Sequence, residues 1–286
     1  MILSEHKQQT LDRMVRDLQQ VEHVAAVVLG GSHCTGMAHA HSDLDIGIYY
    51  HSQQPFDIGQ IAAVARAHST GGDPTVTDFY QWGAWVNGGA WIVTESGEVD
   101  LLYRNIDQVR DTIGKSKQGV WEQDFQQQPP FGFSSVIYLA ETHDCIPLYD
   151  PHQVIEELKR EVAVYPPNLQ RAIVQQALWS AEFTRWQAGK FARQEDLYNT
   201  AGCVTRALKN LIDALFALNG WYPIGDKHAI RRIQEAPVCP DRLEEQIADI
   251  VCLERHTLTA RTEQLGSLFA QVRAAAGSLY TPYFEL

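Results

Sequence analysis

Two aspartates separated by one residue form the clearest chemical signal in the sequence. Asp43 and Asp45 flank Leu44 in the run Ser-Asp-Leu-Asp-Ile-Gly-Ile, which is apolar enough to form a strand. Side chains alternate between the two faces of a strand, so both carboxylates are expected on the same face. Two such charges repel each other unless a cation lies between them, and Mg²⁺ prefers carboxylate oxygens and substrate phosphates as ligands. The pair therefore predicts a magnesium site.

A glycine turn precedes this pair. Gly30, Gly31 and Ser32 interrupt the apolar run 25–29, which is short and branched enough to be a buried strand. Glycine adopts backbone angles that other residues resist, and successive backbone N–H groups in such a turn can bind a phosphate. Ser42, at the end of the loop that follows, is a further candidate contact. A phosphate-binding turn beside a metal pair predicts a site for a nucleoside triphosphate.

The order of strand, glycine turn, loop and Asp-x-Asp strand resembles the DNA polymerase β-like nucleotidyltransferase superfamily, in particular its bacterial branch of aminoglycoside and minimal nucleotidyltransferases. The resemblance rests on Gly31-Ser32, a loop ending in Ser42, and Asp43-Leu44-Asp45. It implies transfer of a nucleoside monophosphate from a nucleoside triphosphate, most simply ATP, with two Mg²⁺ ions and pyrophosphate as the leaving group. Minimal members often have Ala-Arg-Gly after Gly-Ser-x, whereas this chain has Cys34-Thr35-Gly36.

The resemblance also implies a third carboxylate on a later strand, and Asp100 is the expected residue. It lies inside the apolar strand 98–104, which is predicted to form a hairpin with 90–94, and an unpaired charge at such a position is costly. Glu98 lies on the same face and is the alternative, either as the general base or as an acceptor contact. A purely structural alternative pairs Asp100 with Arg104 or Arg110.

Two tryptophans and two basic residues complete the candidate site. Packing in the core is the favoured interpretation of Trp82 and Trp85, but both lie among glycines and are therefore also candidate acceptor contacts. In the resembling branch, a lysine after a Tyr-Pro turn points toward the nucleotide, which implies this role for Lys227. Arg206, on the preceding predicted helix, is a weaker candidate for the same nucleotide.

A cluster of histidines and one cysteine follows the glycine turn. Such residues can ligate zinc, but their spacing matches no common zinc site, so a polar loop over the nucleotide is favoured. The cluster consists of His33, Cys34, His39 and His41.

The acidic composition argues against a nucleic-acid partner. The 286 residues carry a formal net charge of −12 and contain no dense run of Lys or Arg, whereas nucleic-acid binding normally relies on a basic patch. The favoured acceptor is therefore a hydroxyl of a small molecule, with an aminoglycoside-like cation as the leading candidate. Two alternatives remain open: an AMPylating, toxin–antitoxin type of nucleotidyltransferase that modifies a protein, and a non-catalytic nucleotide-binding regulator.

The remaining sequence features predict a cytoplasmic protein without a membrane span. The five cysteines are odd in number and scattered, which suits a reducing compartment better than a disulfide framework. The first residues lack the layout of a secretion signal, and no window is apolar for long enough to cross a bilayer. The oligomeric state cannot be inferred from the sequence.

These features together predict an α+β fold. Residues 1–150 are expected to form the nucleotidyltransferase catalytic domain, with a mixed β-sheet flanked by helices that include 4–22 and 56–68. Beyond Pro151 only helical periodicity recurs, so residues 151–286 are expected to form an all-α helical bundle.

Overall fold

A computed structural model describes residues 3–39 and 42–284 of the protein. The chain forms two compact units, and neither is continuous in sequence. The first unit comprises Met1–Gly114 and Tyr138–Ala163, and the second comprises Lys115–Ile137 and Val164–Leu286. This division differs from the single boundary after residue 150 that the sequence suggested.

Specific contacts account for the difference. Residues 151–163 stay with the first unit because Lys159 donates hydrogen bonds to the backbone carbonyls of His143 and Cys145, each at 2.6 Å. The segment 115–137 joins the second unit because the Asn168 side chain donates to the Lys117 carbonyl at 3.0 Å. Such contacts between distant segments are not visible in local periodicity.

A six-stranded mixed sheet forms the centre of the first unit. The strand order is β3-β4-β5-β2-β1-β8, and only the β2–β5 pair is parallel. The bounds are β1 Ala26–Leu29, β2 Leu44–Tyr50, β3 Thr75–Val76, β4 Gly89–Thr94, β5 Gly97–Asn105 and β8 Ile146–Tyr149. The predicted hairpin is confirmed as β4 and β5, and the predicted mixed sheet is confirmed with it.

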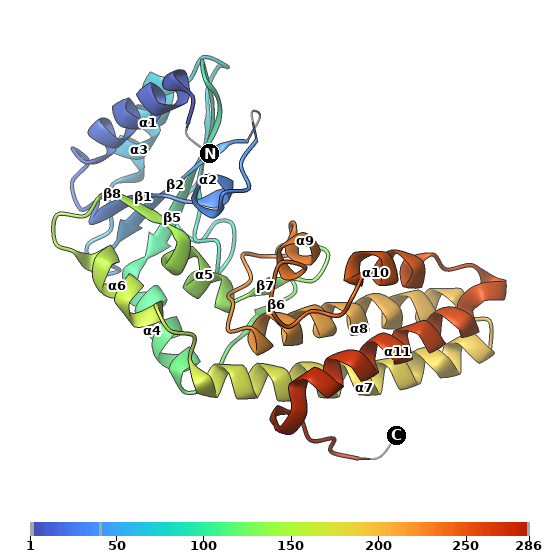
Figure 1. The fold of residues 1–286 in the computed structure, drawn as a ribbon. Helices are drawn as coiled ribbons and strands as arrows, with labels where there is room; N and C mark the ends of the chain where they lie inside the picture. The colour runs from blue at the N-terminus through green and yellow to red at the C-terminus, as the bar shows by residue number, and fades with distance from the viewer. Residues whose placement is uncertain (1–2, 40–41, 285–286) are drawn as a thin grey trace. The chain divides into compact units, whose positions relative to one another are not determined.

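Helices α1 and α3 cover one face of this sheet (Figure 1). Met14 on α1, Ile61 on α3 and Ile46 on β2 are all fully buried in the shared core. The helices assigned mainly to the first unit, of which α4 and α5 each include residues of the second, are α1 Glu5–Leu18, α2 Gly31–Thr35, α3 Ile58–His68, α4 Ile106–Lys117, α5 Val136–Asp144 and α6 Val154–Val162. The helices that periodicity predicts over 4–22 and 56–68 correspond to α1 and α3, which are somewhat shorter.

The opposite face of the sheet is covered by α5 at one end. There, Arg104 on β5 is 4% exposed and donates two hydrogen bonds to Glu141 on α5, both at 2.7 Å. Its guanidinium carbon also lies 5.5 Å from the centroid of the Tyr138 ring. Toward the other end of this face, Asp45 and Asp100 are only partly buried. That end holds the polar residues predicted to carry chemistry.

The second unit is a helical bundle with a small two-stranded sheet. Helices α7 (Pro167–Arg193), α8 (Leu197–Leu218) and α11 (Leu258–Ala276) pack side by side (Figure 1). The other elements are α9 Ala229–Ile233, α10 Leu243–Val251, two short 3-10 helices, Arg255–Thr257 and Gly277–Leu279, and the pair β6 Gln123–Asp124 and β7 Phe133–Ser134. The predicted α+β class is confirmed. No helix within the described residues is long and apolar enough to cross a membrane.

Candidate active site

Several strand ends meet at one edge of the sheet. β1 and β2 are antiparallel, so the end of β1 at Leu29 lies beside the start of β2, where Leu29 pairs with Ile46. β5 runs parallel to β2, and the pairing of Leu44 with Val99 brings its start to the same edge. The glycine turn after β1, the two aspartates at the start of β2 and the third on β5 are therefore neighbours in space.

Asp45, Asp100 and Trp91 form a row across β2, β5 and β4. Asp45 is the register partner of Asp100, and Asp100 is the register partner of Trp91. Residues opposite each other on paired strands point to the same face, so the three side chains share one surface. Asp43 lies directly before β2, and Glu98 is an exposed residue of β5 two positions before Asp100. By alternation both belong to the same face as the row.

The glycine turn packs directly against the first carboxylate of the row. The backbone N–H of Gly30 donates to the Asp45 carbonyl at 2.8 Å. Gly31 has φ +61°, and a Cβ atom at that position would lie 1.7 Å from Asp45 Oδ2. Only glycine fits there, because a side chain would displace the carboxylate and strain the backbone. Ser32 follows in α2 and is partly buried.

The electrostatics of Asp100 reflect its neighbours. Burial, followed by the charges of Asp45, Asp43 and Glu98, raises the pKa of Asp100 to about 6. Arg104 forms its ion pair with Glu141, and Arg110 approaches Glu157 at 3.4 Å. The structural alternative, in which one of these arginines pairs with Asp100, is therefore wrong. When no cation is bound, the negative charges of Asp45, Asp43 and Glu98 instead disfavour the ionised form of Asp100.

Replacing Asp100 with asparagine is expected to stabilise the metal-free protein. The folded protein holds the Asp100 proton up to about pH 6, whereas an unfolded chain releases it near pH 3.8. The folded state thus binds more protons between these values, so the contribution of Asp100 to stability is lost as the pH rises from 4 to 6. Because solvent screens this partly exposed group, we expect Asp100→Asn to raise the free energy of unfolding by about 1–2 kcal/mol above pH 6.

Urea denaturation in a chelating buffer measures this effect. The gain should shrink toward zero below about pH 3.8, where Asp100 is largely protonated in both the folded and the unfolded state. A gain of equal size at both pH values, or a loss at neutral pH, would contradict the repulsion between carboxylates.

The tryptophans of the segment before β4 have different environments. Trp82 stacks on Trp91, with ring centroids 4.2 Å apart and an interplanar angle of 28°. Trp85 instead lies edge-on to Tyr138, with centroids 5.5 Å apart, and its carbonyl accepts a hydrogen bond from the Tyr138 hydroxyl. Trp85 thus has packing contacts of the kind that the sequence favoured, whereas Trp82 lies beside the row. Trp91 was not among the predicted site residues.

Comparison with known families identifies this region. Residues 10–81 match the model of a nucleotidyltransferase domain, and the match includes the glycine turn, Asp43 and Asp45. Residues 10–81 are thus similar to nucleotidyltransferase domains, which supports the resemblance of this region to the DNA polymerase β-like nucleotidyltransferase superfamily. Residues 136–228 match a second model, a domain of unknown function named DUF4037.

Other comparisons add little to this assignment. No curated protein matches the chain. Among solved structures, a nucleotidyltransferase-like protein from Exiguobacterium sibiricum 255-15 aligns with a TM-score of 0.45 and 9% identity, covering 96% of this chain and 78% of that one. A likeness of this extent supports no functional conclusion.

The carboxylates of Asp45 and Asp100 fit a magnesium ion that shares its ligands with a substrate. Among residues 3–39 and 42–284, no three His, Cys, Asp or Glu side chains form a group that could hold a metal ion. Mg²⁺, however, usually binds through one or two carboxylates and takes other ligands from substrate phosphates and water. The adjacent Asp45 and Asp100 suit this arrangement, and a divalent cation would relieve their repulsion. The ligand set Asp43, Asp45 and Asp100 stays a prediction.

The zinc alternative gains no support. The thiol of Cys34 donates to the Leu29 carbonyl at 2.7 Å, and burial raises its pKa to about 11. Zinc binds the thiolate form, which this environment disfavours. His33 and Cys34 lie in α2, His39 lies in the loop that follows, and His41 lies outside the described residues.

The loop before β2 contains a lysine contact that sequence reasoning missed. The Ser42 hydroxyl, predicted to contact the nucleotide, accepts a hydrogen bond from the His39 backbone N–H at 2.9 Å and thereby supports the loop. The Ser42 carbonyl accepts a hydrogen bond from the ammonium group of Lys7 on α1. Lys7 thus places a positive charge at the carbonyl of the residue before Asp43. The sequence did not predict the contact of Lys7, because a charged residue on an amphipathic helix is ordinarily just part of its polar face.

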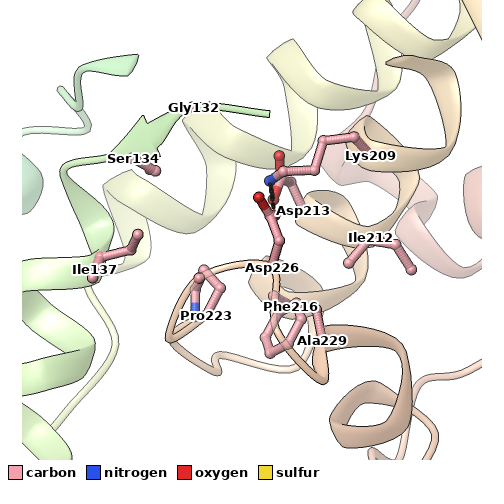
Figure 2. Close-up of a pocket in the computed structure, with 11 residues that line it drawn as sticks. Gly132, Ser134, Ile137, Lys209, Ile212, Asp213, Phe216, Pro223, Asp226 and Ala229 are labelled. Atoms are coloured by element: carbon pink, nitrogen blue, oxygen red, sulfur yellow. Dashed lines mark hydrogen bonds and ion pairs between the residues drawn. The ribbon is translucent and has the colours of Figure 1, made fainter. Parts of the chain in front are cut away.

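The two basic residues predicted to bind the nucleotide, Lys227 and Arg206, lie in the second unit and are exposed. Lys227 directly follows Asp226, which lies 3.5 Å from the Lys209 ammonium, while Lys209 also binds Asp213 at 2.6 Å (Figure 2). The pocket beside these charges has a volume of about 20 Å³, enough for one water-sized molecule and too small for a nucleotide. The charges therefore anchor the segment before Lys227, and the nucleotide contacts of Lys227 and Arg206 stay predictions.

Proposed function

We propose that the protein transfers a nucleoside monophosphate from a nucleoside triphosphate, with ATP as the expected donor, to a hydroxyl of a small molecule. Pyrophosphate is the leaving product. The observation that carries this proposal is the packing of the glycine turn against Asp45, whose neighbour across the sheet is Asp100. A phosphate-binding backbone and a pair of carboxylates within one site suit phosphoryl-group chemistry, because that chemistry depends on positioning and charge neutralisation.

Each group of the site has an assigned role in this proposal. The backbone N–H of Gly31, together with Ser32, holds the β- and γ-phosphates, whereas the N–H of Gly30 is already bonded to the Asp45 carbonyl. Asp43, Asp45 and Asp100 would hold two Mg²⁺ ions, which would supply neutralisation of the phosphate charge and a lower pKa for the acceptor hydroxyl. Asp100 accepts the proton of that hydroxyl, with Glu98 as the alternative base.

A mass-shift screen tests this function. The protein is incubated with Mg²⁺, each of the four common nucleoside triphosphates and a library of metabolites and antibiotics that includes aminoglycosides. We expect one acceptor to gain the mass of a nucleoside monophosphate, with release of pyrophosphate that stops when the metal is chelated. Transfer to a protein side chain would instead favour the AMPylating alternative. Transfer to single-stranded DNA or tRNA, with none to any small molecule, would contradict the proposal.

A further inference from the structure

Trp91 occupies an unusual position for a tryptophan. It lies within β4, which is hydrogen-bonded to strands on both sides, yet its side chain is 49% exposed. Large aromatic side chains in strands normally bury most of their surface. Trp82 stacks on one face of Trp91, so a second aromatic ring fixes the orientation of the exposed indole. The stacked pair forms a rigid aromatic surface next to Asp100.

The strand order indicates whether this surface lies on the side of the leaving phosphates or on the side of the acceptor. Across the sheet the order is β1, β2, β5 and β4, so the glycine turn, Asp45, Asp100 and Trp91 follow one another in that sequence. In phosphoryl transfer the attacking and leaving oxygens lie roughly in line on opposite sides of the phosphorus. If the leaving phosphates bind the glycine turn, the acceptor approaches from the side of β4. That side is where Trp91 lies.

We propose that Trp91, supported by Trp82, is the acceptor-binding surface of the site and that it binds a hydroxylated organic cation. The inference rests on the proposed nucleotidyl transfer. A cation gains from the face of an indole and from carboxylates nearby, and both are present because Glu98 is exposed on the same face as Asp100. The acceptor oxygen then bonds to the α-phosphorus, and the bond from that phosphorus to the bridging oxygen of pyrophosphate breaks. The hydroxyl proton passes to Asp100 or Glu98.

The test uses choline and its uncharged isostere, in which carbon replaces the quaternary nitrogen. Both probes carry one hydroxyl and have the same shape, so they differ in charge alone. NMR of the indole N–H signals of the seven tryptophans, with Mg²⁺ and a non-hydrolysable ATP analogue present, reports where each probe binds. We expect choline to shift the Trp91 and Trp82 signals and to bind at least about fivefold more tightly than the isostere.

Three variants separate the proposed contact from a change in folding. Trp91→Leu should weaken choline binding by about tenfold, and Trp91→Phe should retain most of it because the aromatic face remains. Val93→Ala is the matched control, since Val93 is 50% exposed on the same strand and face, and it should bind choline as the wild type does. All three variants should bind the ATP analogue normally, which shows that the sheet edge is intact.

The possible results have distinct meanings. Equal binding of choline and the isostere, or choline binding that survives Trp91→Leu, would overturn the inference. Loss of ATP-analogue binding in Trp91→Leu would also overturn it, because the stack would then hold the nucleobase. If the wild type binds no nucleotide at all, the proposed function fails. Normal nucleotide binding without any choline response refutes only the role of Trp91.

Discussion

Replacing Asp43 and Asp45 together with asparagine is expected to abolish metal-dependent binding of nucleoside triphosphates while the protein stays folded. Asparagine keeps the size of the side chain but loses the negative charge that a divalent cation needs. We expect affinity for Mg²⁺–ATP to fall by at least about a hundredfold, since altering even the outer partners of metal ligands costs about 10- to 100-fold. Isothermal titration calorimetry with and without Mg²⁺ measures the loss.

The matched control removes the same number of charges elsewhere. Asp12 on α1 and Asp73 after α3 are exposed aspartates of the same unit, so Asp12→Asn with Asp73→Asn reproduces the change in net charge. This control should bind nucleotide like the wild type. If the Asp43/Asp45 variant also binds Mg²⁺–ATP with unchanged affinity, the assignment of the metal site is wrong.

The sequence carried much of the information needed for the carboxylates. Asp43 and Asp45 stand out through local alternation, and Asp100 through its place inside an apolar strand. Trp91 could not be found in this way, because its significance depends on register with β5. Trp82 and Trp85 were chosen from the glycines around them, and in the structure Trp82 stacks on Trp91 whereas Trp85 packs against Tyr138. Which side chains share a surface is a tertiary property.

The same distinction explains the features of the fold that were missed. The strands of the β6–β7 pair have two residues each and α9 has five, too few to show a period. β8 contains Pro147 and was not expected to be a strand. The proline is tolerated because β8 lies at the edge of the sheet. Long helices with repeated apolar positions, such as α8, were predictable because their pattern spans several turns.

Replacing Glu141 with glutamine is expected to be among the most destabilising single changes in the first unit. Arg104 is 4% exposed and depends on Glu141 for two hydrogen bonds of 2.7 Å. Removing one partner of a buried ion pair leaves an uncompensated charge, which costs about 3–5 kcal/mol. The loss of stability should appear as a lower midpoint of urea denaturation for the first unit. Spectroscopic probes placed in the sheet would monitor that unit.

Two further variants show whether burial causes the effect. Glu157→Gln makes the same chemical change in the pair that Glu157 forms with Arg110, whose side chains are 52% and 42% exposed, and should cost less than about 1 kcal/mol. Arg104→Met with Glu141→Leu removes both charges of the pair and should be less destabilising than Glu141→Gln alone, since the buried Arg104 charge is then no longer left unpaired. Equal losses for Glu141→Gln and Glu157→Gln would mean that solvent reaches Arg104. The α5 end of the sheet would then not depend on this ion pair.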